Sequence, residues 1–315
     1  MALEIFRLQC EHNKIYRSYI DALHVNPVQV KRIEDIPFLP IQFFKTNQVT
    51  TSNFEPEIIF ESSGTTGENT SRHFVKKLSL YEESFLTGFK LFYGDPRELC
   101  ILALLPGYLE RKNSSLVTMA DHLIKLSDNS HSGFYLHNHE KLYQTLVHNE
   151  IRKQPVLLVG VTFALLDFAE NYSMDLNYTT VMETGGMKGR REELTREEVH
   201  NFLKRKLGLQ QIHSEYGMTE LLSQAYSTGK GLFKCPPWMK VLTREEDDPL
   251  EITAFPKKYK PSTGLLNIID LANIYSCSFI ATDDVGKLYD NESFEVLGRR
   301  DMSDLRGCSL LTAGD

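Results

Sequence analysis

Two uninterrupted apolar segments, residues 99–105 and 156–161, constrain the fold of this chain more than any other feature of its sequence. A strand with one solvent-facing side alternates apolar and polar residues, whereas a strand covered on both faces is apolar throughout. Shorter β-prone runs stand at 58–60, 179–182 and 211–213, with helix-like segments between the runs. This alternation predicts an α/β fold whose largely parallel sheet is covered by helices on both faces.

The pattern changes after residue 250, where three short β-prone runs are separated by turn residues: 265–270, 278–281 and 294–297. We expect a β-rich C-terminal part. The predicted organisation is a helical and extended lead-in arm at 1–55, followed by a core domain at 56–315 with an α/β part (58–250) and a β-rich end (251–315). Within the arm, segment 36–45 contains two prolines, which disfavour helix, so an extended conformation is expected there.

Two helices carry clear terminal signals. The clearer one is predicted at 196–207, where Thr195 is the N-cap and Glu198, three residues later, completes a capping box. The same pattern predicts a second helix that begins at Ser79 and ends near Gly94, a residue type that commonly ends helices.

Composition excludes several classes of protein. Acidic residues outnumber basic ones and the formal net charge is −7, which argues against nucleic-acid binding through a basic surface. No apolar run approaches the roughly 20 residues of a membrane-spanning helix, so no stable membrane insertion is expected. The N-terminus lacks a signal-type apolar core. The five cysteines contain no CxxC pair, as in a reduced, cytoplasmic protein.

Segment 62–67 is the first candidate binding motif. Its sequence is Ser-Ser-Gly-Thr-Thr-Gly, six small residues that cannot build a core but can bring backbone N–H groups and hydroxyls close to a phosphate. No Gly-Lys-Ser/Thr follows, so the segment is not a Walker loop. An ordinary flexible loop is the alternative.

Three further polar motifs lie downstream. Segment 213–220, His-Ser-Glu-Tyr-Gly-Met-Thr-Glu, offers an aromatic face for a base and a carboxylate for Mg²⁺. Segment 281–286 places two acids directly after an apolar strand, at the carboxyl end where α/β folds bind ligands. Segment 298–308 contains Gly-Arg-Arg and a cysteine. A helix start, a polar hairpin turn and a charged surface loop are the respective alternatives.

The order and spacing of these motifs resemble those of the adenylate-forming (ANL) superfamily of acyl-CoA synthetases, peptide-synthetase adenylation domains and phenylacetate-CoA ligases. Within it, the chain looks most like the bacterial acyl-protein synthetases, which are long-chain-fatty-acid–protein ligases. The likeness covers about residues 36–311, and segments 36–45, 105–111 and 304–310 contribute to it. It implies the large N-terminal domain of an adenylate-forming enzyme, without the small C-terminal lysine domain.

The resemblance implies ATP and Mg²⁺ as cofactors and assigns roles to matching residues. The ATP pyrophosphate would lie on Ser62, Ser63, Gly64, Thr65, Thr66 and Gly67. Adenine would contact Thr184, Gly185, Gly186 and Ser214 and stack on Tyr216. Thr219 would touch the α-phosphate and Glu220 would bind Mg²⁺, while Asp284, assisted by Arg299, would bind the ribose hydroxyls.

The sequence departs from the family pattern in three ways. No lysine follows the 62–67 loop closely, since Lys76 is the nearest. The Gly-Arg segment at 298–307 is compressed. The last lysine is Lys287, so the C-terminal lysine of larger relatives is not supplied by this chain. Lys188 is a candidate substitute, and a solvated turn lysine is the alternative interpretation.

The resemblance also implies the second half of the reaction. Acyl-protein synthetases carry an acyl-accepting cysteine near their C-terminus, where Cys308 stands, two residues after Arg306. A nearby guanidinium lowers a thiol pKa and raises the thiolate fraction. A buried structural cysteine is the alternative.

The leading hypothesis is an acid–thiol ligase that activates a carboxylic acid, by default a long-chain fatty acid, and passes the acyl group to a protein or carrier thiol. One alternative is an acyl- or aryl-CoA ligase that needs a partner domain. The other is a non-catalytic adenylate-binding or carrier-docking subunit.

Overall fold

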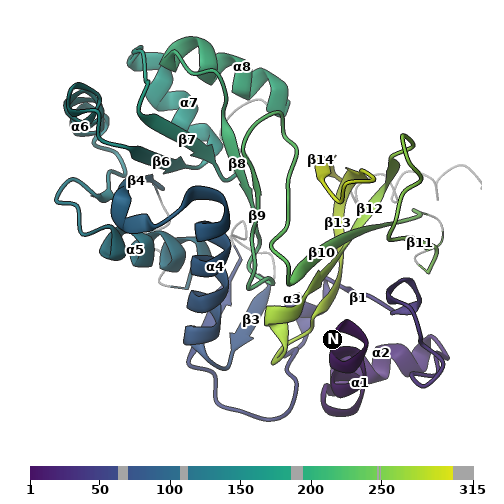
Figure 1. Cartoon of the computed structure of the whole chain (residues 1–315). Coiled ribbons are helices and arrows are strands. Elements are labelled where there is room, and N and C mark those ends of the chain that lie inside the picture. Colours follow the sequence, from purple (N-terminus) through teal and green to yellow (C-terminus); the bar gives the residue numbers. More distant parts are fainter. Residues whose placement is uncertain (63–69, 107–112, 186–193, 247, 249, 301–315) are drawn as a thin grey trace, which may run out of the picture.

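The computed structural model describes residues 1–62, 70–106, 113–185, 194–246, 248 and 250–300. Within these ranges the chain forms one mainly parallel sheet and one mainly antiparallel sheet, which occupy different halves of the molecule (Figure 1). The predicted α/β class with a β-rich C-terminal part is confirmed.

The parallel sheet has the strand order β5-β4-β6-β7-β8-β9, and only β9 is antiparallel to its neighbour. Its strands are β4 (Cys100–Leu104), β5 (Gly133–Phe134), β6 (Val156–Gly160), β7 (Thr179–Glu183), β8 (His213–Tyr216) and β9 (Ala225–Ser227). All residues of β4 and β6 are buried, as their unbroken apolar runs predict. Because β7 and β8 are parallel, their last residues, Glu183 and Tyr216, lie at the same edge of the sheet.

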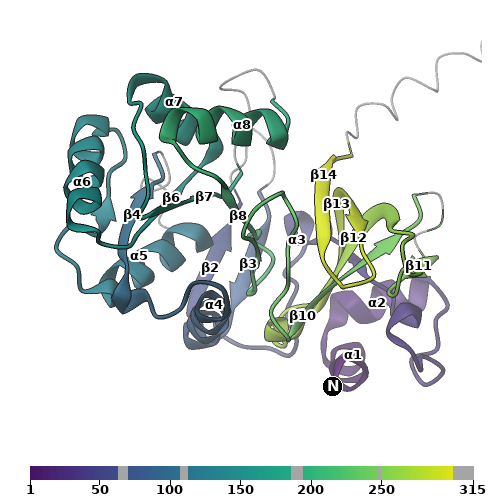
Figure 2. The ribbon, with the colours of Figure 1, turned by 45° about the horizontal axis from the view of Figure 1, so that its top comes forward.

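Helices pack on both faces of this sheet (Figure 2), with α4 and α5 on one face and α6, α7 and α8 on the other. Their bounds are α4 (Leu78–Tyr93), α5 (Ser115–Ser127), α6 (His139–Arg152), α7 (Thr162–Asn171) and α8 (Arg196–Leu207). Short 3₁₀ turns are η1 (Ile33–Asp35), η2 (Pro96–Glu98) and η3 (Leu271–Asn273). No helix within the described residues is long and apolar enough to cross a membrane.

The helix predictions are confirmed for α8 and partly wrong for α4. In α8, Thr195 and Glu198 form the predicted capping box. Helix α4 ends at Gly94, as predicted, but its N-cap is Lys77 rather than Ser79. The carboxylate of Glu57 accepts a hydrogen bond from the Leu78 N–H at 2.7 Å, so a distant side chain does the capping that the sequence assigns to Ser79.

The antiparallel sheet has the order β11-β10-β12-β13, with β14 also paired to β13. Its strands are β10 (Met239–Arg244), β11 (Ile252–Thr253), β12 (Ser262–Asp270), β13 (Phe279–Leu288) and β14 (Phe294–Arg299). The N-terminal arm packs on this sheet through α1 (Ala2–His12), α2 (Lys14–Ala22), β1 (Leu39–Pro40) and α3 (Phe43–Thr46). Strand β1 pairs in parallel with β13, so arm and sheet share one hydrophobic core.

Three local predictions need correction. Asp284 does not follow a strand but lies inside β13, because antiparallel pairing with β14 extends the strand past the apolar run. The strand predicted at 211–213 begins at His213 and continues to Tyr216. The segment 36–45 is only partly extended, since α3 begins at Phe43.

A separate hairpin is formed by β2 (Ile58–Glu61) and β3 (Arg72–Val75). It packs against α4, where the Phe60 and Tyr81 rings meet edge to face, 5.1 Å between centroids. The hairpin therefore holds both ends of the segment that contains the Ser/Thr/Gly motif.

Candidate active site

Three residues expected to contact the nucleoside meet between the two sheets. The Tyr216 hydroxyl, at the end of β8, donates to Asp284 Oδ2 at 2.8 Å. Arg299 Nε donates to the other oxygen, Asp284 Oδ1, at 3.1 Å. Asp284 and Arg299 are paired in the β13–β14 register, which fixes their approach. Burial and the neighbouring Asp284 charge raise the Tyr216 pKa well above its ordinary value, so the phenol stays a donor.

Two phenylalanine rings pack against the Tyr216 ring. The rings of Phe233 and Phe294 lie edge-on to it, with centroids 5.9 and 5.5 Å away. Only 8% of Tyr216 is exposed. Its position is therefore set both by aromatic packing and by the hydrogen bond to Asp284.

Glu220 lies beside the base of the Ser/Thr/Gly loop. Ser62 N donates to Ser71 O at 3.0 Å, and Ser71 N donates to Ser62 Oγ at 2.9 Å. The Ser71 side chain hydrogen-bonds in turn to Glu220. Burial raises the Glu220 pKa, although Ser71 and the more distant charges of Arg299 and Lys45 act to lower it. Glu220 is thus tied to the hairpin through Ser71, and the charge of Arg299 reaches it.

Thr219 is positioned through its backbone. The His73 side chain, from β3, contacts the Thr219 carbonyl oxygen through Nδ1 at 2.8 Å. Because burial lowers the His73 pKa to about 4, the imidazole is neutral at pH 7 and donates this bond as its Nδ1–H tautomer. Asn273 Nδ2 donates to the Glu220 carbonyl oxygen at 2.7 Å. The Thr-Glu pair is therefore held both from the hairpin and from η3, the turn that follows β12.

The residues predicted to contact adenine lie around a buried carboxylate, Glu183, that the sequence analysis did not single out. Gly185 N donates to Glu183 Oε2 at 2.8 Å, and Thr162 Oγ1 donates to the same oxygen at 3.1 Å. Arg196 Nε and His200 Nε2 lie 3.5 and 3.7 Å from Glu183 Oε1. A lone acid at the carboxyl end of an apolar strand is the signal that could have identified it.

The partners of Glu183 keep it ionised. Burial opposes its charge, but the nearby His200, the charge of Arg196 and the hydrogen bond from Gly185 N outweigh burial and lower the pKa to about 2. Ser214 is completely buried, and its Oγ lies 3.4 Å from His200 Nε2. Thr184 remains partly exposed, and its N–H donates to the Gly160 carbonyl at 3.1 Å. Ser214 is thus tied into the Glu183 network, whereas Thr184 is accessible to a ligand.

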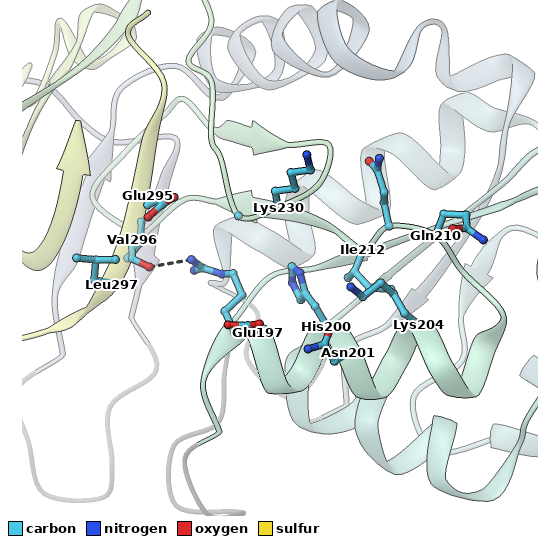
Figure 3. A pocket seen from close by; sticks show the side chains of 13 residues that line it. Glu197, His200, Asn201, Lys204, Gln210, Ile212, Lys230, Glu295, Val296 and Leu297 are labelled. Carbon is cyan, nitrogen blue, oxygen red and sulfur yellow. Dashed lines mark hydrogen bonds between the residues drawn. The ribbon is translucent and has the colours of Figure 1, made fainter. Parts of the chain in front are cut away.

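A cavity of about 570 Å³ opens next to this network, between α8 and β14 (Figure 3). Arg196 and His200 line it, and Arg196 Nη1 donates to the Val296 carbonyl at 2.8 Å. Lys204, Lys230 and Glu295 also line the cavity. Arg196 therefore connects the Glu183 network to the edge of β14.

Several predicted site residues lie outside the described residues: Ser63, Gly64, Thr65, Thr66, Gly67, Gly186, Lys188 and Cys308. The other predicted residues fall into two groups. Tyr216, Asp284 and Arg299 are joined by hydrogen bonds, and Ser62, Thr219 and Glu220 are tied to Ser71 and His73 at the β2–β3 hairpin. Thr184, Gly185 and Ser214 belong to the neighbouring Glu183 region.

Comparisons with known proteins place the chain in a family. A sequence model of the acyl-protein synthetase family, LuxE, matches residues 1–314. A long-chain-fatty-acid–luciferin-component ligase of Aliivibrio fischeri is 24% identical over 343 residues, which cover 98% of this chain and 86% of that protein.

Two solved structures align with the chain. A long-chain-fatty-acid-CoA ligase from Archaeoglobus fulgidus aligns with a TM-score of 0.50 and 16% identity over 76% of this chain and 51% of that one. An o-succinylbenzoate CoA synthetase from Bacillus subtilis, solved with its acyl-adenylate intermediate, aligns with a TM-score of 0.49 and 16% identity over 80% of this chain and 63% of that one. The chain spans less than two-thirds of either solved chain. By its family match, the chain belongs to the acyl-protein synthetase family, LuxE.

Proposed function

We propose that the protein converts a carboxylic acid, by default a long-chain fatty acid, and ATP into an acyl-adenylate and then transfers the acyl group to a protein thiol. The observation that carries this proposal is the cluster of Tyr216, Asp284 and Arg299, joined by hydrogen bonds, with the buried carboxylate of Glu220 near enough for the Arg299 charge to act on its pKa. These groups are a ribose-type acceptor, an aromatic wall and a phosphate-side carboxylate, which together suit one nucleotide. Family membership supports the acyl chemistry.

In the first half-reaction a carboxylate oxygen attacks the α-phosphorus. The bond from that phosphorus to the bridging oxygen breaks, and its electron pair leaves with pyrophosphate. No general base is required because the carboxylate is already ionised at pH 7. The transition state carries high negative charge, so the protein contributes mainly positioning and electrostatic stabilisation. In our assignment, Thr219 contacts the α-phosphate and Asp284 the ribose hydroxyls. Ser62 and the loop that it begins contact the pyrophosphate.

The residues present suit Mg²⁺ on the phosphate side. Glu220 is 5% exposed, its pKa is raised by burial, and no salt bridge neutralises it within the described part of the chain. One carboxylate together with substrate phosphates and water is a common ligand set for Mg²⁺. Glu220 would hold the ion, which when bound would offset phosphate charge.

The second half-reaction joins the acyl carbon to a thiolate sulfur and releases AMP with the electron pair of the broken C–O bond; the thiol proton goes to solvent. Cys308 is our proposed acceptor, and Arg306 would favour its thiolate. The four cysteines in the described residues suit this role poorly. Burial raises the thiol pKa of Cys10, Cys235 and Cys277 to about 12 and that of Cys100 to about 11.

Exchange of labelled pyrophosphate into ATP tests the first half-reaction. We expect exchange that requires both Mg²⁺ and a carboxylic acid, with fatty acids as the best substrates in a panel that includes aromatic acids. Absence of exchange with every acid, in a protein shown to be folded, would contradict the proposal.

Labelled fatty acid tests the transfer step. With ATP, the wild type should gain a label that neutral hydroxylamine removes, as a thioester requires. Cys308→Ala should still catalyse pyrophosphate exchange but retain no label. A label that persists in Cys308→Ala would exclude this cysteine as the acceptor.

A further inference from the structure

The N-terminal arm, residues 1–55, packs directly against the proposed nucleotide site. Strand β1 pairs with β13, and Ile41 N continues the pairing by donating to the Ala281 carbonyl at 2.9 Å. Gln42 Nε2 then donates to both carboxylate oxygens of Asp283, at 2.8 and 2.7 Å. Asp283 precedes the proposed ribose ligand, so these contacts fix the arm next to the nucleotide.

Helix α3 carries the arm from β13 to the hairpin. Phe44 is fully buried, and its ring meets the His73 ring edge-on at 6.0 Å between centroids. His73 is the residue that contacts the Thr219 carbonyl. The backbone of the next residue, Lys45, is therefore held in place by a buried neighbour that packs on His73.

Lys45 and Arg72 face a common pocket of about 380 Å³, which Thr46 and Thr70 also line. Both cationic side chains are exposed, and neither forms a salt bridge with any described residue. Two cations that share a pocket without an acidic partner repel each other, and a bound anion would remove the repulsion. The pocket is thus chemically suited to a polyanion.

Its location identifies the polyanion. Thr70 and Arg72 flank Ser71, whose side chain hydrogen-bonds to Glu220 and whose backbone is paired with Ser62. The sequence lacks a lysine directly after the Ser/Thr/Gly loop, where many superfamily members have one. Lys45 and Arg72, which line one pocket at the β2–β3 hairpin, can supply positive charge beside this loop.

We propose that Lys45 and Arg72 bind the β- and γ-phosphates of ATP and the pyrophosphate that leaves. This inference rests on the proposed function and adds two residues to it. When the bond between the α-phosphorus and the bridging oxygen breaks, negative charge builds up on the departing pyrophosphate, and two fixed cations stabilise that charge. The charge of Lys45 also reaches Glu220, the proposed Mg²⁺ ligand.

Comparison of ATP with AMP tests the inference because AMP lacks the two phosphates. Calorimetry without the acid substrate, at one fixed Mg²⁺ concentration, gives both dissociation constants. We expect Lys45→Ala and Arg72→Ala each to weaken ATP binding about 10-fold while AMP binding changes less than about 2-fold, as expected for loss of a charge-assisted contact. Lys45→Arg should keep most of the ATP affinity. Lys31→Ala, which removes an exposed lysine from the same arm, is the matched control and should bind both nucleotides normally.

Each other outcome has a distinct meaning. If ATP and AMP affinity fall together, or if neither falls in Lys45→Ala and Arg72→Ala, the pyrophosphate assignment is wrong while the proposed function stands. If the wild type binds neither nucleotide, the proposed function fails and takes this inference with it.

Discussion

Two buried carboxylates, Glu183 and Glu220, lie in neighbouring regions of the site but in opposite electrostatic environments. Glu183 is surrounded by Arg196, His200 and two hydrogen-bond donors, and its pKa is lowered to about 2. Glu220 has a raised pKa because burial outweighs its few favourable contacts. Both are about equally inaccessible to water, at 5% exposure each.

The difference separates a structural carboxylate from one that depends on a ligand. A buried charge is tolerated only when partners compensate it. The protein itself provides that compensation for Glu183, so this residue organises the turn at Gly185 without any ligand. Glu220 lacks such compensation, which is expected of a group that meets a cation only when nucleotide is bound.

The largest expected effect is on stability. Glu183→Gln should lower the free energy of unfolding by about 3 kcal/mol because Arg196 and His200 lose their buried anionic partner. Urea denaturation at pH 7 measures this change. The folded variant should keep AMP affinity within a few-fold, since an amide oxygen can still accept from Gly185.

The stability that ionised Glu183 contributes should depend on pH. A lowered folded-state pKa means that the charged form stabilises the protein above the unfolded value of 4.5 and that this stability is lost as the pH falls toward about 2. The stability difference between wild type and Glu183→Gln should therefore shrink over that interval. A difference that stays constant down to pH 2 would show that the ionised carboxylate is not the source.

Glu220→Gln should behave in the opposite way. We expect pyrophosphate exchange to fall about 100-fold, the size of effect seen when one electrostatic contact to a transition state is removed. Its thermal stability at pH 8 should equal or exceed that of the wild type, because a raised pKa means that ionisation of Glu220 destabilises the fold as pH rises. A strongly destabilised variant would place Glu220 with Glu183 among the structural groups.

Asp284→Asn should act on the nucleoside rather than on the phosphates. The variant loses the charge that pairs with Arg299, and we expect ATP and AMP to bind about 10-fold more weakly by similar factors. Calorimetry with both nucleotides checks this. Selective loss of ATP affinity alone would place Asp284 on the phosphate side instead.

The smallest expected effect concerns the helix that carries the partners of Glu183. Thr195→Ala removes the N-cap of α8 and should lower stability by about 1 kcal/mol. AMP affinity should change less than about 2-fold. If the AMP affinity of Thr195→Ala fell by about 10-fold, as expected for Asp284→Asn, helix α8 would have to contribute to nucleotide binding.

Much of the parallel half could be predicted from sequence because its signals are local. Unbroken apolar runs gave β4 and β6, and a four-residue capping pattern gave α8. The start of α4 was not predictable, since its capping carboxylate comes from Glu57, outside the helix. Local patterns cannot reveal such a distant partner.

Some residues of the candidate site could likewise be predicted from sequence, and others could not. The motif residues Tyr216, Asp284 and Arg299 could be chosen from sequence, and the structure brings them together. The Glu183 network and the pocket of Lys45 and Arg72 were missed because each depends on contacts between distant segments. For Lys45 that contact is the pairing of the arm with β13, which no local pattern indicates.

A crystal structure with ATP and Mg²⁺ bound tests the central claim most directly. The account predicts one nucleotide with its base beside Tyr216, its ribose on Asp284 and its phosphates between Glu220 and the hairpin that bears Ser62. A nucleotide bound elsewhere, with Tyr216 and Asp284 still bonded only to each other and to protein, would contradict it.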